Sequence, residues 1–306
     1  MNTCLFPEKF LSTRDVIIWC ELGFKVMNSF RRKIKGIILL NDNVKTIRLE
    51  DGRHLSFAEF GETAGKPIFH FHGYPGSRLE GKITSPTAAK CGVRLIAVDR
   101  PGMGLSDFKP KRTILDWPDD VAELADFLKI DRFAVEGTSG GGPYSVACAY
   151  KISDRLTSAG ILSGAGPHWD PGEPWSKPSD MKSVEGFWLQ FSTHLPEPDR
   201  RVILDPPMLK LLTEEMFEAF QQGAEGPAYE RELYGKDWGF KLEDISPNVN
   251  VYLWHGELDV NVPISMGRSM AKAIPSCKAE FYAEEGHYST ALNHLEEIIR
   301  TLSSPR

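Results

Sequence analysis

The chain has 306 residues, of which 41% are hydrophobic and 25% charged, the composition of an ordinary globular protein. A formal net charge of −6 and a pI near 5.8 indicate neither a nucleic-acid partner nor attraction to an anionic membrane. The five cysteines are odd in number and lack metal-ligand or redox spacing, which favours free thiols in a reducing compartment, so we expect a cytoplasmic protein.

Residues 1–44 form a separate N-terminal segment that we expect to be helical. Its stretch 15–36 is apolar, but Glu21 and Lys25 interrupt it, so it falls short of the ~18–20 apolar residues that span a bilayer. Four basic residues follow the apolar part: Arg31, Arg32, Lys33 and Lys35. We favour a helix packed on the domain or on a second subunit, and shallow membrane attachment is the alternative.

From residue 45 to residue 166, short apolar runs alternate with segments of helical periodicity. The runs that predict strands are 45–49, 54–61, 67–73, 93–99, 132–137 and 158–166. The segments that predict helices are 85–92, 114–130 and 143–151. Asp51-Gly52 between the first two runs is a hairpin signal. Strands separated by helices predict a parallel sheet that is covered on both faces.

The alternation stops at residue 167 and resumes at residue 248. Residues 167–247 are rich in proline and tryptophan, then helix-like and apolar, without an obvious strand, so we expect a helical insertion mounted on the sheet. After it we expect strands within 248–259 and 278–286 and helices within 263–274 and 289–302. The domain prediction is therefore a core made of 45–166 and 248–306, interrupted by the insertion.

The sequence Gly137-Thr138-Ser139-Gly140-Gly141 lies between a predicted strand and a predicted helix. A serine hydroxyl becomes a nucleophile only when a base takes its proton, an acid orients that base, and donors hold the oxyanion. Small residues two positions before and after the serine allow a sharp turn that exposes the hydroxyl. Ser139 is therefore a candidate nucleophile.

Candidate partners for Ser139 follow the last two predicted strands. Asp259 lies in the turn after one strand, and His287 follows the glycine that ends the next. Carboxyl ends of parallel strands meet at one edge of a sheet, so the three side chains are expected together. Glu257 and Asp170 are the alternative acids.

The elbow pattern and the chain order serine, acid, histidine resemble the α/β-hydrolase fold family over about residues 45–303. The resemblance implies an α/β fold with a mostly parallel eight-stranded sheet, helices on both faces and a helical cap formed by residues 167–247. It implies Ser139 as nucleophile, His287 as base and Asp259 as acid.

Two further stretches carry the resemblance. Residues 70–77 match the family's His-Gly-x-Pro loop, which implies that the backbone N–H groups of Tyr74 and Gly140 form the oxyanion hole. Residues 99–107 resemble a loop of the branch that includes epoxide hydrolases and haloalkane dehalogenases. Those enzymes carry aspartate at the elbow, so Ser139 argues for acyl transfer instead.

Several other polar and aromatic residues are expected to have structural roles rather than catalytic or metal-binding ones. His70 and His72 lack nearby further ligands, so we expect no metal site and assign His72 to support of the oxyanion loop. Asp99 and Arg100 are expected to brace loops around the site. Five aromatic residues form either the cap's own core or, in part, an acyl pocket: Trp169, Trp188, Phe191, Phe217 and Trp238.

The function expected from these features is serine hydrolysis of a small or medium hydrophobic carboxylic ester through an acyl-enzyme on Ser139. No cofactor or metal is expected, and the partner is a small-molecule substrate, bound by a monomer or homodimer. The alternatives are a cofactor-free perhydrolase or carbon–carbon bond hydrolase of the same fold, and a non-enzymatic ligand-binding protein that keeps the triad.

Overall fold

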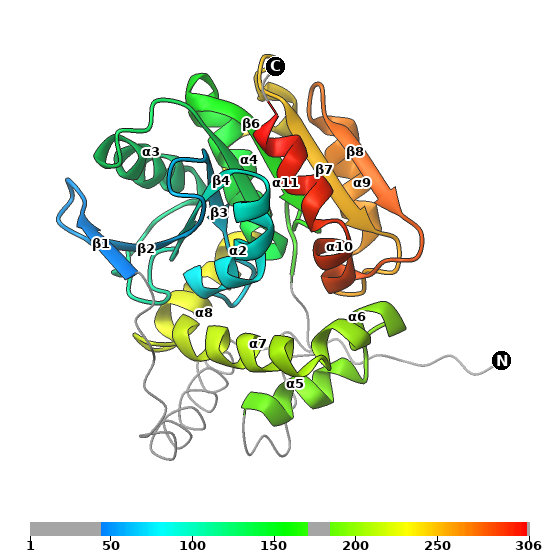
Figure 1. Cartoon of the computed structure of the whole chain (residues 1–306). Coiled ribbons are helices and arrows are strands. Elements are labelled where there is room, and N and C mark those ends of the chain that lie inside the picture. Colours follow the sequence, from blue (N-terminus) through cyan, green and yellow to red (C-terminus); the bar gives the residue numbers. More distant parts are fainter. Residues whose placement is uncertain (1–43, 171–183, 305–306) are drawn as a thin grey trace.

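The computed structural model of the chain describes residues 44–170 and 184–304 (Figure 1). Nearly all of the N-terminal segment 1–44 lies outside the described residues, as do residues 171–183 of the predicted insertion. The packing or membrane role of the N-terminal segment therefore stays a prediction. None of the helices within the described ranges combines the length and the apolar character needed to cross a membrane.

Eight strands form one sheet in the order β1-β2-β4-β3-β5-β6-β7-β8. The strands are β1 Val44–Arg48, β2 His54–Gly61, β3 Lys66–Phe71, β4 Val93–Val98, β5 Phe133–Thr138, β6 Leu156–Leu162, β7 Val251–Gly256 and β8 Lys278–Tyr282. β2 pairs antiparallel with both β1 and β4, and all other neighbours are parallel. The predicted mostly parallel, eight-stranded sheet is confirmed.

Helices cover both faces of the sheet and build the insertion. They are α2 Gly81–Lys90, α3 Trp117–Phe127, α4 Gly142–Lys151, α5 Val184–Ser192, α6 Glu197–Ile203, α7 Pro206–Ala219, α8 Glu225–Gly235, α9 Ile264–Ala273, α10 His287–Asn293 and α11 Leu295–Ser303. Short 3-10 helices are η1 Arg78–Glu80, η2 Ile114–Asp116, η3 Ser139–Gly141, η4 Ser153–Arg155 and η6 Leu242–Asp244.

The central strands are mostly apolar because both of their faces are buried. Successive residues of a strand point to opposite faces, so Ile68 packs with α2 and α11, whereas Phe69 packs with α3 and α4. The same alternation recurs at Leu253 and Trp254 of β7. Two apolar layers, one on each side of the sheet, therefore form the core.

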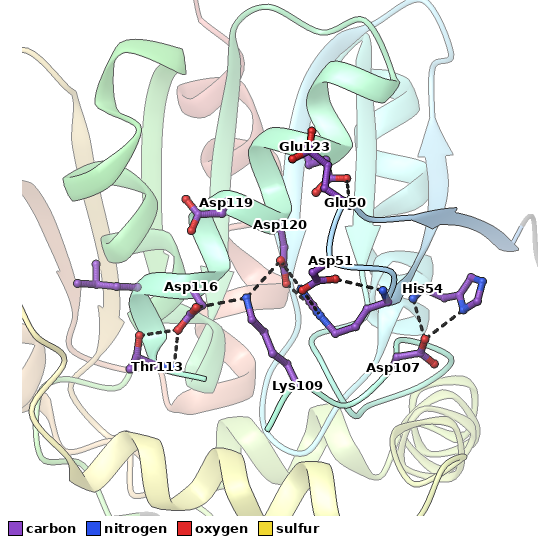
Figure 2. Close-up of polar contacts among 12 residues, drawn as sticks. Glu50, Asp51, His54, Asp107, Lys109, Thr113, Asp116, Asp119, Asp120 and Glu123 are labelled. Carbon is purple, nitrogen blue, oxygen red and sulfur yellow. Dashed lines mark hydrogen bonds and ion pairs between the residues drawn. The ribbon is translucent and has the colours of Figure 1, made fainter. Parts of the chain in front are cut away.

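The turn between β1 and β2 is anchored on α3 by ion pairs. Arg53 in this turn donates to Asp120 of α3 at 2.6 and 3.1 Å. Figure 2 shows Lys109 between Asp116 and Asp120, with Nζ–O distances of 3.2 and 3.9 Å. The contacts of Arg53 thus join the edge of the sheet to α3, and those of Lys109 join the loop after β4 to the same part of the helix layer.

The insertion between β6 and β7 contains helices α5, α6, α7 and α8, which lie together beside one end of the sheet (Figure 1). It has an apolar cluster of its own, made of Phe187, Trp188, Phe191, Leu195, Ile203, Leu212, Ala219, Phe220 and Ala228. Phe217 packs at the border of this cluster, whereas Trp169 and Trp238 belong to the main core. Most of the aromatic residues singled out in the sequence thus serve as core.

The predicted single C-terminal helix over 289–302 is wrong in one respect, because the structure contains two helices. α10 begins at His287, and α11 begins after a break at His294, whose φ of −113° and ψ of 10° are not helical. The ring of His294 stacks on Tyr282 of β8 with centroids 3.6 Å apart. The break separates α11, which packs on strands β3, β5 and β6, from α10, which packs on both α6 of the insertion and β7.

Candidate active site

The turn after β5 holds Ser139 in a strained backbone conformation. Its φ of 53° lies in the left-handed region, where residues other than glycine are uncommon. Such strain occurs mainly at functional sites, where the surrounding structure enforces it. Ser139 begins η3 directly after the strand, so the serine lies at the carboxyl edge of the sheet.

The two glycines that flank Ser139 are required by close backbone contacts. A Cβ atom at Gly137 would lie 2.1 Å from the carbonyl oxygen of Gly141, and one at Gly141 would lie 2.0 Å from the carbonyl oxygen of Phe71. Both distances are far below van der Waals contact, so no larger residue fits at either position. The sharp turn predicted from the Gly-x-Ser-x-Gly pattern is present.

Asp259 and His287 meet at the same edge of the sheet. Nδ1 of His287 lies 2.7 Å from Oδ2 of Asp259. The other carboxylate oxygen accepts the backbone N–H groups of Asn261 and Val262, each at 2.8 Å. These contacts fix the carboxylate so that it orients the imidazole through one ring nitrogen and leaves Nε2 available for proton transfer.

Burial and neighbouring charges shift the pKa values of both His287 and Asp259. Burial opposes the charge of His287, but the adjacent Asp259 carboxylate outweighs it and raises the pKa of the imidazole above its ordinary value. Burial likewise opposes the charge of Asp259, but His287 and His255 together lower the pKa of that carboxyl. Each partner therefore stabilises the charged form of the other.

The alternative acids have other partners. Oε1 of Glu257 lies 2.7 Å from Arg268, and the side chain is 38% exposed. Asp170 pairs with Arg231 at 3.2 Å and is 66% exposed. Of the three candidate acids, Asp259 is the one that contacts His287.

The predicted oxyanion residues lie side by side. An ideal Cβ at Gly140 would be 2.6 Å from Cβ of Tyr74, and one at Gly73 would be 3.7 Å from Cβ of Ser139. The Tyr74 hydroxyl donates to the carbonyl oxygen of Pro227 in α8 at 3.0 Å. The loop that follows β3 therefore adjoins both the nucleophile elbow and the insertion.

His72 and Arg100 brace this loop, as predicted. Burial and the neighbouring Arg100 lower the pKa of His72, which keeps the ring neutral. Nε2 of His72 accepts the backbone N–H of Arg100 at 3.2 Å, so Nδ1 carries the proton and donates to the carbonyl oxygen of Gly73 at 2.8 Å. The Arg100 guanidinium donates to the carbonyl oxygens of His72 and Gly73.

A comparison with known protein families matches residues 68–301 to the Alpha/beta hydrolase family. The chain belongs to this family. Two solved structures with the same fold are a hydrolase from Pseudomonas aeruginosa PA01 and the enol-lactonase from Burkholderia xenovorans LB400. The first has a TM-score of 0.68 and 17% identity, and the match covers 85% of this chain and 98% of that one. The second has a TM-score of 0.66 and 21% identity, with coverage of 84% and 97%.

Curated relatives of this α/β hydrolase match only part of its sequence. Lipase 1 of Psychrobacter immobilis is 30% identical over 151 residues, which is 48% of this chain and 44% of the lipase. The acetyltransferase component of the acetoin cleaving system of Pseudomonas putida (dihydrolipoyllysine-residue acetyltransferase) is 33% identical over 116 residues, or 38% and 31% of the two chains. The chain thus spans less than half the length of the curated relatives it matches.

A chain of buried charges supports the loop after β3 of this α/β hydrolase, and no pattern in the sequence indicates it. Glu80 in η1 accepts the backbone N–H of Gly73 at 2.6 Å. His70 lies between Glu80 and Glu136, at 3.4 and 2.5 Å. Burial opposes its charge, but the two carboxylates outweigh this and raise the pKa of His70 to about 10. A charged His70 therefore holds Glu80 against the loop.

Two further residues at the site had no decisive signal in the sequence. Nε2 of His255 lies 3.2 Å from Oδ2 of Asp259, and its position four residues before the aspartate could have suggested this contact. Asp199 in α6 accepts the backbone N–H of His287 at 2.8 Å, although 88 residues separate the two. A contact across that separation depends on the tertiary fold, which no local pattern encodes.

Proposed function

We propose that the protein is a serine hydrolase that cleaves a small or medium hydrophobic carboxylic ester through an acyl-enzyme on Ser139. The 2.7 Å contact between His287 and Asp259 carries the proposal, because it orients a histidine at the edge of the sheet where Ser139 lies. Family membership and the partial similarity to lipases support ester hydrolysis.

In the proposed reaction, Oγ of Ser139 attacks the ester carbonyl carbon while Nε2 of His287 takes the hydroxyl proton. The carbonyl oxygen becomes an oxyanion, which the backbone N–H groups of Tyr74 and Gly140 would stabilise. The protonated His287, held by Asp259, then donates its proton to the alkoxide, which leaves as the alcohol and yields the acyl-enzyme.

Deacylation repeats these steps with water. His287 takes a proton from water as its oxygen attacks the acyl carbon, and the second tetrahedral intermediate expels Ser139. The proton returns to Oγ, and the carboxylic acid is released. The apolar character of the insertion favours a hydrophobic substrate, since burial of apolar groups would contribute to binding.

The test is hydrolysis of p-nitrophenyl esters from short to long acyl chains by the wild type and by Ser139→Ala. We expect kcat to fall by about 10⁶-fold in the variant, the size expected when a serine nucleophile is removed. Ser145→Ala is the matched control, because it removes the hydroxyl of another buried serine, on α4, four residues beyond the elbow.

The Ser139→Ala protein should melt at the wild-type temperature, since only a hydroxyl in a turn is lost. A fluorophosphonate should transfer its phosphonyl group, with loss of fluoride, to the wild type and to Ser145→Ala, but not to Ser139→Ala, and the adduct is read from the protein mass. Wild-type turnover by Ser139→Ala would contradict the nucleophile assignment. A folded wild type that neither reacts with the fluorophosphonate nor hydrolyses any ester would contradict the proposed function.

A further inference from the structure

Asp199 joins the insertion to the helix that carries the candidate catalytic histidine. The carboxylate is fully buried in α6. Its Oδ2 accepts the backbone N–H of His287 at 2.8 Å, and Oδ1 accepts those of Tyr288 and Ser289, both at 2.9 Å. The first N–H groups of a helix have no partner within it, so a side chain from α6 supplies the acceptors for α10.

The residue before α10 leaves space for this contact. A helix is usually capped by a side-chain oxygen of its own preceding residue, but that residue here is Gly286, which has none. A Cβ atom at Gly286 would lie 2.3 Å from Oδ2 of Asp199. Glycine at this position is therefore required by the approach of Asp199.

Apolar packing reinforces the connection. Tyr288, the residue after the histidine, packs at the border of the insertion's apolar cluster. Its ring meets those of Trp188 and Phe191 edge-on, with centroids 6.4 and 6.5 Å apart. The insertion thus contacts both the backbone of His287 and the side chain of the next residue, Tyr288.

Charge gives Asp199 an influence on the imidazole itself. Burial alone would lower the pKa of the His287 ring. Three carboxylates raise it instead: Asp259, Asp199 and Glu80. They come from three separate parts of the chain, namely the turn after β7, helix α6 and helix η1. The negative charge of Asp199 also offsets the positive end of the α10 dipole, which would otherwise disfavour a protonated histidine.

We propose that Asp199 is a positioning residue that holds His287 in place through the backbone of α10, so that the insertion forms part of the catalytic machinery. The proposal rests on the proposed function, in which His287 is the base. Displacement of a catalytic group by about 1 Å can cost about 10²-fold in rate, which makes this backbone anchor a determinant of kcat.

The decisive variant is Asp199→Asn, which keeps the size of the side chain but replaces one acceptor oxygen with an NH₂ group. We expect kcat for p-nitrophenyl butyrate to fall about 10- to 100-fold with little change in KM. We also expect NMR titration of the His287 ring, assigned with His287→Asn, to give a lower pKa than in the wild type. Glu197→Gln is the control, because it removes an exposed carboxylate from the same helix.

The NMR readout separates this proposal from the proposed function. If the wild type hydrolyses no ester, the proposed function fails, yet a lowered His287 pKa in Asp199→Asn still supports the positioning contact. A folded Asp199→Asn protein whose His287 titrates as in the wild type, and whose kcat is unchanged where the wild type is active, overturns the proposal.

Should Asp199→Asn fail to fold, Asp199→Ala combined with Gly286→Asp supplies a carboxylate from the residue before α10. Loss of the Asp199 carboxylate vacates the space that a Cβ at position 286 needs. We expect the double variant to fold and its His287 pKa to lie near that of the wild type. If the folded double variant has a His287 pKa below the ordinary histidine value, the carboxylate no longer acts on the ring. Wild-type kcat in such a variant would overturn the proposal, because the reaction would not need the contact.

Discussion

Three partners surround the Asp259 carboxylate: the imidazole of His287, the imidazole of His255 and the backbone of the turn that follows. Because Asn261 and Val262 donate to one oxygen and the two histidines approach the other, the carboxylate cannot rotate without losing hydrogen bonds. Its negative charge is thus held beside His287. This arrangement favours the protonated imidazole that forms when a serine is deprotonated.

The pH dependence of activity follows from the raised pKa of His287. A general base must be neutral, so kcat/KM should fall as the pH drops through that pKa, with a midpoint above the ordinary histidine value of 6.5. Asp259→Asn should cut kcat by about 10⁴-fold and move the midpoint to lower pH. Glu257→Gln, two residues away, should leave both unchanged, and a larger loss in this control would make Glu257 the acid.

At the scale of elements, helix α7 reaches the loop after β3, which holds the proposed oxyanion donor Tyr74, through Glu215. Its Oε1 accepts the backbone N–H of Ser77 at 3.3 Å, and its carboxyl lies near that of Glu80. Burial raises the pKa of Glu215 well above its ordinary value, and the Glu80 carboxylate raises it further. A protonated Glu215 can donate to Glu80, which accepts from Gly73 in turn.

Glu215 should make stability depend on pH. The folded protein binds this proton more tightly than the unfolded chain, so its contribution is fully present below pH 4.5, the ordinary value, and is lost as the pH rises toward the folded pKa. Glu215→Gln keeps an acceptor for Ser77 and a donor for Glu80 without titrating. Urea unfolding between pH 5 and 8 should therefore show the variant gaining stability relative to the wild type.

The control for this measurement is Glu214→Gln on the same helix. Glu214 pairs with Lys210 and Lys82 and is partly exposed, so its stability difference from the wild type should not change over the same pH range. Parallel pH curves for Glu215→Gln and the wild type would show that Glu215 is already ionised at pH 5.

In the whole molecule, buried ion pairs join the insertion to the core. Arg100, after β4, pairs with Glu230 of α8 at 2.7 Å, and neither side chain is exposed to solvent. Arg78 of η1 pairs with both Asp99 and Glu218, the latter on α7, at 2.6 Å each. The insertion is thus held to the core by charges that cannot be separated without leaving one unpaired in the interior.

Arg100→Met should destabilise the protein by about 3 to 5 kcal/mol in urea unfolding, because it removes the shorter ion pair of Glu230 and leaves the one to Arg112 at 3.4 Å. Arg268→Met, which removes an exposed pair with Glu257, should cost less than about 1 kcal/mol. The double variant Arg100→Met and Glu230→Leu should lose less stability than the sum of its single changes. Additive losses would show that the Arg100–Glu230 pair contributes no coupling energy.

Local patterns in the sequence were sufficient for most of the fold. Strands buried on both faces are mostly apolar, and the helix at Trp117–Phe127 shows its period in Val121, Leu124 and Ala125. The break at His294 was not predictable in this way, because both halves keep helical residues and the interruption depends on packing against Tyr282 and α6.

In the candidate site, too, some residues have a local sequence signal and others depend on tertiary packing. Ser139 and its flanking glycines carry a local signal, since the backbone of the turn excludes larger side chains, and the chain order of Asp259 and His287 follows from the ends of two strands. Asp199 and Glu215 are ordinary acidic residues of amphipathic helices, and Glu80 lies in a short loop helix. The spacing of these three residues in the sequence does not indicate that they belong to the site.

The sequence by itself thus determined the layered α/β architecture, the elbow and the identity of the three candidate catalytic residues, because each depends on neighbours a few positions away or on the order of strands. Only the tertiary structure decided which carboxylates surround those residues. Buried charges depend on partners that the fold brings from distant segments, as Asp199 is brought to His287, and burial is what makes their effect on the site large.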